Sequence, residues 1–170
     1  MKSRTLVLAR HAKAKSHASS DAARELSARG HADAAAMGRW LSESGQSFDA
    51  VVCSASVRTR ETWRDIESAG VSGGDVTFDE RVYSADQNEL LHVLAEVPDS
   101  VTSVLVIGHA PTIPELTDAL ADRETSDPDA LAALRSNFPT ACLAVLTVNQ
   151  PWASLTSGGA KLTDVIAPRG

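Results

Sequence analysis

Four short apolar runs, separated by long polar and amphipathic segments, predict buried β-strands. They cover residues 5–9, 50–53, 104–107 and 142–148. Each run is continuously apolar rather than alternating, which is typical of a strand that is buried on both faces of its sheet. Weaker strand candidates lie at residues 76–78, 152–156 and 162–167.

The segments between these runs have the residue spacing of amphipathic helices. In residues 30–44, Ala34, Met37 and Leu41 recur at intervals of three and four and share one helical face with Trp40. Further helices are expected at residues 58–67, 88–97, 114–121 and 128–135. Strand and helix therefore alternate over most of the chain.

This alternation favours an α/β fold: a three-layer α/β/α sandwich with a mostly parallel central sheet. Residues 152–167 are expected to add strands in another direction. The start of the helix at 128–135 is marked by Asp127 and Pro128, an N-cap acid followed by a proline in the first turn. The 170 residues are 43% hydrophobic, which predicts a single domain over residues 1–170.

Charge and cysteine content exclude several classes of protein. A net charge of -6 argues against a nucleic-acid binder, because such proteins depend on many Lys and Arg contacts to phosphates. Cys53 and Cys142 lie inside or at the start of apolar runs and are expected to be buried free thiols. The first apolar run is too short for a signal peptide or a membrane span, so we expect no membrane partner and a cytoplasmic location.

Polar, reactive residues directly follow three of the strong apolar runs. They are Arg10-His11 after the first run, Ser54 to Arg58 after the second, and Gly108-His109 after the third. Ligands of open α/β sheets bind beyond the carboxyl ends of the strands. If these strands are parallel neighbours, two histidines and at least two arginines converge on one small site.

Such a group of residues suits a phosphoryl ligand. Arginine presents a planar fork of donors that matches phosphate oxygens, and a histidine ring nitrogen can attack phosphorus to form a covalent intermediate. Each residue also has a simpler interpretation: Arg10 as a surface ion-pair partner, His11 and His109 as structural imidazoles, and Arg58 as a solvated helix residue. Arg58 would lie in a first helical turn, where a cation is disfavoured by the helix dipole, which favours an anionic partner.

Three motifs in this order resemble those of the histidine phosphatase superfamily, which includes phosphoglycerate mutases. "LVLARHAKA" is similar to the first motif, with Ala where many members have Gly. "DAVVCSASVRTRETW" is similar to the second, and "VLVIGHAPTIPEL" to the third. The short chain and "DAARELSARGHADA" after the first motif resemble the small SixA-type phosphohistidine phosphatases.

This resemblance implies a phosphoglycerate mutase-like fold and a role for each matched residue. His11 would be the phosphorylated nucleophile, Arg10 and Arg58 would bind the phosphoryl oxygens, and His109 would stabilise the transferring group by donating a hydrogen bond. Arg24 would lie near the pocket. The arginines would supply the positive charge that Mg²⁺ supplies in kinases, so neither a metal nor a cofactor is expected.

The sequence departs from the larger members of the family at the general acid. The position that would carry this acid falls near Ser84, in "FDERVYSADQNELL", and Ser cannot serve. Glu80 and Asp86 lie nearby but outside the position of the motif. An imidazole leaving group, with a pKa of ~6.5, needs less protonation than an alkoxide. The expected function is therefore removal of phosphate from phosphohistidine in a protein.

Other functions remain open at this point. A broad phosphomonoesterase of small phosphorylated metabolites or phosphoproteins, with Glu80 or Asp86 as acid, is one alternative. A phosphate-binding interaction module without turnover is another. A cysteine-based phosphatase has an Arg after Cys and five intervening residues. Counted from Cys53, this Arg would fall at position 59, where the chain has Thr59. The remaining histidines lack metal-ligand spacing; they are His17, His31 and His92.

Overall fold

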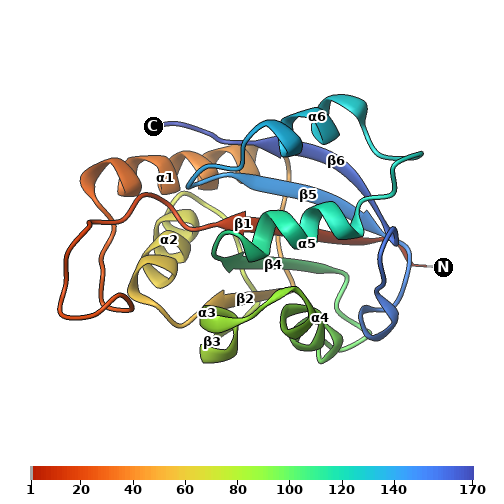
Figure 1. Cartoon of the computed structure of the whole chain (residues 1–170), viewed down its shortest axis with the longest axis horizontal. Helices are drawn as coiled ribbons and strands as arrows, with labels where there is room; N and C mark the ends of the chain where they lie inside the picture. The colour runs from red at the N-terminus through yellow and green to blue at the C-terminus, as the bar shows by residue number, and fades with distance from the viewer. Residues whose placement is uncertain (1) are drawn as a thin grey trace.

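The computed structural model describes residues 2–170 and contains one six-stranded sheet with helices on both faces (Figure 1). The strand order is β3-β2-β4-β1-β5-β6. The strands are β1 Arg4–Arg10, β2 Ala50–Ser54, β3 Asp75–Asp79, β4 Ser103–Gly108, β5 Leu143–Val148 and β6 Ala160–Ile166. The helices are α1 Ala28–Glu43, α2 Val57–Ser68, α3 Glu80–Ser84, α4 Gln87–Ala95, α5 Thr112–Leu120 and α6 Pro128–Ser136. The predicted three-layer α/β fold is confirmed.

Strand β1 lies inside the sheet and is buried on both faces. Leu6 and Leu8 pack against one hydrophobic cluster, which includes residues of α4, α5 and α6. Val7 and Ala9 pack against the other, which includes residues of α1 and α2. This two-sided burial explains why the strand has a continuous apolar sequence.

The helix starts follow local capping chemistry. Helix α1 begins at Ala28, two residues before its predicted start, because Ser27 caps it by accepting a hydrogen bond from the backbone N–H of Gly30. Helix α6 begins at Pro128, and the side chain of Asp127 caps it as predicted. The short helix α3 was not predicted; its five residues bury only Val82 and therefore show no helical period.

The sheet is mostly parallel, as predicted, but the prediction that residues 152–167 run in another direction was wrong. β1, β4, β2 and β3 are mutually parallel, whereas β5 runs antiparallel to β1. The chain enters β5 beside the end of β1, where the backbone N–H of Arg10 donates to the Cys142 carbonyl, so β5 must run back along the sheet. β6 reverses again and is therefore parallel to β1.

Residues 152–156 form no strand. Trp152–Ser154 is a single 3-10 turn after Pro151, whose fixed φ and missing N–H favour a turn over a sheet ladder. The indole of Trp152 is buried and its Nε1 donates to the carbonyl of Val101 at 2.8 Å. Trp152 and Leu155 therefore pack in the hydrophobic core without pairing with a strand of the sheet.

Cys53 and Cys142 are both buried free thiols, as predicted. Within residues 2–170, no helix combines the length and apolarity needed to cross a bilayer.

Candidate active site

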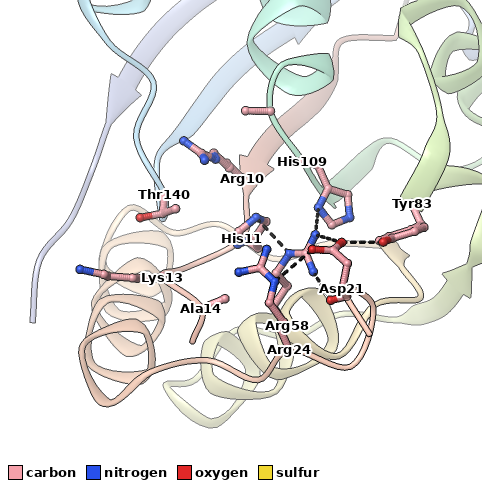
Figure 2. A pocket seen from close by; sticks show the side chains of 11 residues that line it. Arg10, His11, Lys13, Ala14, Asp21, Arg24, Arg58, Tyr83, His109 and Thr140 are labelled. Atoms are coloured by element: carbon pink, nitrogen blue, oxygen red, sulfur yellow. Dashed lines mark hydrogen bonds and ion pairs between the residues drawn. The ribbon is translucent and has the colours of Figure 1, made fainter. Parts of the chain in front are cut away.

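The carboxyl ends of three parallel neighbours, β1, β2 and β4, meet at one edge of the sheet. Their last residues are Arg10, Ser54 and Gly108, and His11 and His109 follow directly. A pocket of about 530 Å³ lies there (Figure 2). It is lined by Arg10, His11, Lys13, Ala14, Asp21, Arg24, Arg58, Tyr83, His109, Ala110 and Thr140. The predicted convergence of two histidines with the arginines is confirmed.

His11 is buried at the base of this pocket and is held in one orientation. Its backbone N–H donates to Gly108 and its carbonyl accepts from Ala141, which fixes the residue between β4 and β5. The ring Nδ1 lies 2.7 Å from the carbonyl oxygen of Ala12. A carbonyl only accepts, so Nδ1 carries the proton and Nε2 is unprotonated and keeps its lone pair.

The environment of His11 keeps its ring neutral. Burial lowers the pKa of His11 to about 3, and the neighbouring cationic side chains act in the same direction, while the hydrogen bond to Ala12 opposes them. An imidazole with an unprotonated Nε2 at neutral pH is the form that acts as a nucleophile.

Arg58 bridges the two histidines. Its Nε donates to His11 Nε2 at 3.4 Å, and its Nη2 lies 3.4 Å from His109 Nδ1. The same guanidinium donates to the backbone oxygen of Asp21 at 2.9 Å and to its carboxylate at 3.1 Å. The side chain is buried in the first turn of α2, so its charge is compensated by these partners rather than by water.

His109 is anchored from behind by Ser54. Its Nε2 lies 2.8 Å from the Ser54 hydroxyl, which is completely buried at the end of β2. Arg58 can only donate, so Nδ1 of His109 accepts from it and Nε2 carries the proton in this state. Burial, followed by the charge of Arg58, lowers the pKa of His109 to about 4.

Arg10 lies on the wall of the pocket with few partners. Its Nη1 donates to the carbonyl of Phe138 at 3.2 Å, and its buried Nε has no hydrogen-bond partner within residues 2–170. Burial lowers its pKa from the ordinary arginine value. A desolvated guanidinium with a donor left over is suited to an anionic ligand.

One carboxylate, which the sequence reasoning missed, lies among these cations. Asp21 accepts from the Tyr83 hydroxyl at 2.5 Å and from Arg24 Nε at 3.0 Å, in addition to Arg58 (Figure 2). The hydrogen bond from Tyr83, together with the two arginines, holds the pKa of Asp21 well below its usual range. Arg24, placed near the pocket by resemblance, lines it and also donates to the carbonyl of Lys15.

The two carboxylates considered as general acids are not among the residues that line this pocket in the described chain. Asp86 caps α4, where its side chain accepts from the backbone of Glu89. Glu80 is exposed in the first turn of α3. Lys13 and Tyr83 were also missed as pocket residues; Lys13 follows His11 by two positions, and Tyr83 directly precedes Ser84, the position that the family resemblance had singled out.

The described residues offer no cluster of three His, Cys, Asp or Glu side chains that could hold a metal ion. His31, on α1, instead contacts Asp65 of α2, with 2.6 Å between Nδ1 and Oδ2. The pocket thus provides a neutral histidine nucleophile, arginine donors and a second imidazole, which together can receive a negatively charged electrophile such as a phosphoryl group.

Comparison with known proteins agrees with this chemistry. Residues 6–83 match the family model of the histidine phosphatase superfamily, branch 1. An uncharacterised protein of Mycobacterium tuberculosis is 34% identical over 146 residues, which are 86% of this chain and 90% of that protein.

Two solved structures share the whole fold. A protein of Nakamurella multipartitia, provisionally named phosphohistidine phosphatase SixA, superposes with a TM-score of 0.87 at 37% identity and covers 99% of this chain and 98% of its own. A protein of Agrobacterium tumefaciens with the same provisional name superposes with a TM-score of 0.78 at 28% identity, over 97% and 99% of the two chains.

Proposed function

The chain belongs to the histidine phosphatase superfamily, and on that premise we propose that it removes phosphate from phosphohistidine in a protein through a covalent intermediate on His11. The relatives provisionally named phosphohistidine phosphatases support this substrate. The pocket residues support the chemistry.

The observation that carries the proposal is the state of His11. Its Nδ1–H donates to the carbonyl of Ala12, and its unprotonated Nε2 accepts from the guanidinium of Arg58 at 3.4 Å. A phosphoryl group that approaches Nε2 meets Arg58 first, so binding and alignment for attack occur together. Arg10 lines the same pocket and supplies a second positive charge for the phosphoryl oxygens.

The reaction proceeds in two displacements. His11 Nε2 bonds to phosphorus as the bond to the leaving group breaks, and Arg10 and Arg58 neutralise the charge on the equatorial oxygens. Water then attacks phosphorus and passes a proton to a phosphoryl oxygen as the N–P bond breaks. The electron pair returns to Nε2, and His11 departs as a neutral imidazole because Nδ1 keeps its proton against the Ala12 carbonyl. The backbone of the nucleophile motif thereby assists both formation and breakdown of the intermediate.

His109 joins this pathway by a change of protonation. In this structure its Nδ1 accepts from Arg58. An entering phosphoryl dianion raises the pKa of a neighbouring imidazole, so Nδ1 gains a proton and donates to a phosphoryl oxygen. Ser54 holds the ring while this occurs.

The substrate class follows from the missing acid. Glu80 is exposed outside the pocket, Asp86 caps α4, and Asp21 is held ionised, so none of the three presents a proton to an alkoxide. A phosphohistidine needs no such donor when its other ring nitrogen is protonated. A phosphoprotein is therefore the proposed partner.

The proposed location is the cytoplasm. Cys53 and Cys142 are buried free thiols, which are compatible with this reducing compartment.

The deciding experiment measures phosphate release from a phosphohistidine peptide and from phosphoserine, phosphotyrosine and sugar phosphates, with His11→Ala in parallel. Selective turnover of phosphohistidine, lost in the variant, together with an alkali-stable phosphoenzyme in the wild type, is expected. Equal turnover of phosphoesters would favour the broad phosphomonoesterase. Phosphate binding without turnover of any substrate would favour the interaction module.

A further inference from the structure

Asp21 occupies a position that the reaction described above does not explain. It lies on the exposed loop that follows the nucleophile motif, and it is the only carboxylate among the pocket-lining residues of the described chain. A lone carboxylate beside arginines repels an incoming phosphoryl group. The Asp21 carboxylate therefore needs a favourable interaction with another part of the substrate to offset this repulsion.

Three donors on separate segments place this carboxylate. Arg58 comes from α2, Tyr83 from α3 and Arg24 from the loop itself. Oδ2 accepts from Arg58 and Tyr83, whereas Oδ1 accepts only from Arg24. Because a carboxylate has about four acceptor sites, Oδ1 retains capacity for one further donor.

Asp21 lies at the solvent-exposed side of the pocket, farther from its base than His11. His11 is 8% exposed at the base of the pocket, while the Asp21 side chain is 53% exposed at its mouth. Arg58 spans the two, with Nε toward His11 and Nη2 toward Asp21. An in-line attack by His11 puts the leaving group on the side of phosphorus away from Nε2, which is the side of the opening.

The nucleophile itself shows what a leaving imidazole requires. His11 departs from phosphorus as a neutral ring because its distal nitrogen carries a proton held by an oxygen, that of Ala12. The substrate imidazole has the same requirement. With an ordinary imidazole pKa near 6.5, its distal nitrogen is only partly protonated at neutral pH unless an anion stabilises the N–H.

We propose that Asp21 recognises the substrate imidazole by accepting a hydrogen bond from the ring nitrogen that does not carry the phosphoryl group. In the transfer step the His11 Nε2–P bond forms and the substrate N–P bond breaks, with its electron pair returning to the substrate nitrogen. The distal N–H keeps its proton, so the substrate leaves as neutral imidazole and Asp21 remains ionised. Asp21 is thus a specificity residue for P–N substrates, an inference that rests on the proposed function.

The test compares leaving groups that differ in their need for this N–H. Asp21→Asn is assayed on a phosphohistidine peptide and on p-nitrophenyl phosphate, whose stable leaving anion has no N–H to offer. The expected result is a fall of at least about 10-fold in the ratio of the two kcat/KM values, the size of a hydrogen bond to a charged group. Tyr83→Phe, which removes one anchor of the carboxylate, lowers the same ratio by a smaller factor.

Glu25→Gln is the matched control. Glu25 is a carboxylate on the same segment that pairs with Lys15 and does not line the pocket, so the ratio should stay at its wild-type value. An equal loss on both substrates in Asp21→Asn would assign Asp21 to the support of Arg58 and overturn the inference. Absence of phosphohistidine turnover by the wild type would instead overturn the proposed function.

Discussion

The Nε2 of His109 lies 2.8 Å from the hydroxyl of Ser54, although Ser54 ends β2, His109 follows the end of β4, and the two residues are 55 positions apart. This contact fixes the ring orientation and leaves Nδ1 directed toward Arg58 and the pocket. The parallel pairing of β2 with β4 creates it, because both strands finish at the same edge of the sheet.

Ser54→Ala is therefore expected to lower kcat by up to about 10²-fold with little change in KM, since a misplaced imidazole stabilises the transition state less well. Steady-state kinetics with the phosphohistidine peptide measure the effect. Ser44→Ala, which removes an exposed hydroxyl at the end of α1, is the control for loss of a serine. A change confined to KM would place His109 in substrate binding rather than in stabilisation of the transferring group.

Arg58→Lys is expected to lower kcat/KM by about 10²- to 10³-fold. The guanidinium contacts His11, His109 and both the backbone and side chain of Asp21, and one ammonium group cannot reproduce this planar arrangement of donors. Arg60→Lys is the matched control on the same helix, because Arg60 donates to Ala55 and stacks on Phe78 outside the pocket. Near wild-type activity in Arg58→Lys would reduce the role of Arg58 to that of a point charge.

The four strong strands and the grouping of the candidate site residues in one pocket could be predicted because their signals are local. Leu6 and Leu8 face one cluster and Val7 and Ala9 the other, which produces an apolar run that ends at Ala9, directly before Arg10 and His11. The convergence of strand ends in a parallel sheet then places the remaining histidine and arginine.

The missed features depend on tertiary contacts. Asp21 lies in a polar loop without periodicity, and its role depends on Arg58 and Tyr83, which are 37 and 62 positions away. The reversed direction of β5 follows from the backbone bond between Arg10 and Cys142, which no hydrophobic pattern records.

Stability is expected to fall between pH 7 and pH 5, in part through His11. Its folded pKa of about 3 is below the ordinary value near 6.5, so the unfolded chain takes up a proton in this range that the native protein does not. The contribution of His11 is thus present above pH 6.5 and is lost as the pH falls toward its folded pKa. Asp21 contributes nothing to this window, because its pKa is lowered from 3.8 and its effect lies at more acidic pH.

Urea unfolding at the two pH values measures this dependence. His11→Gln should lose less free energy of unfolding than the wild type, by about 1–2 kcal/mol, since each pKa unit corresponds to about 1.4 kcal/mol. Equal losses in both proteins would show that the ring of His11 titrates in the native state as it does in the unfolded chain.

Arg10 is expected to affect phosphate binding and the free energy of unfolding in opposite directions. Its side chain is half-buried and, among residues 2–170, makes one hydrogen bond, to Phe138, and leaves its buried Nε without a partner. Arg10→Met retains much of the side-chain volume and removes the unsatisfied donor, so the free protein should be as stable as the wild type or more stable by about 1–3 kcal/mol. The variant should at the same time lose the stabilisation that inorganic phosphate gives the wild type, which is about 2.7 kcal/mol at a concentration of 100 times Kd.

Thermal melting with and without phosphate tests both halves of this prediction. Arg123→Met, which removes an exposed ion pair with Asp118, should keep the phosphate-dependent rise in Tm because the side chain lies outside the pocket. If Arg10→Met were strongly destabilised yet still gained stability from phosphate, Arg10 would be a structural residue of the β1 end. The opposite pattern, a stable variant indifferent to phosphate, means that the buried guanidinium is retained for the phosphoryl group and at a cost to the fold.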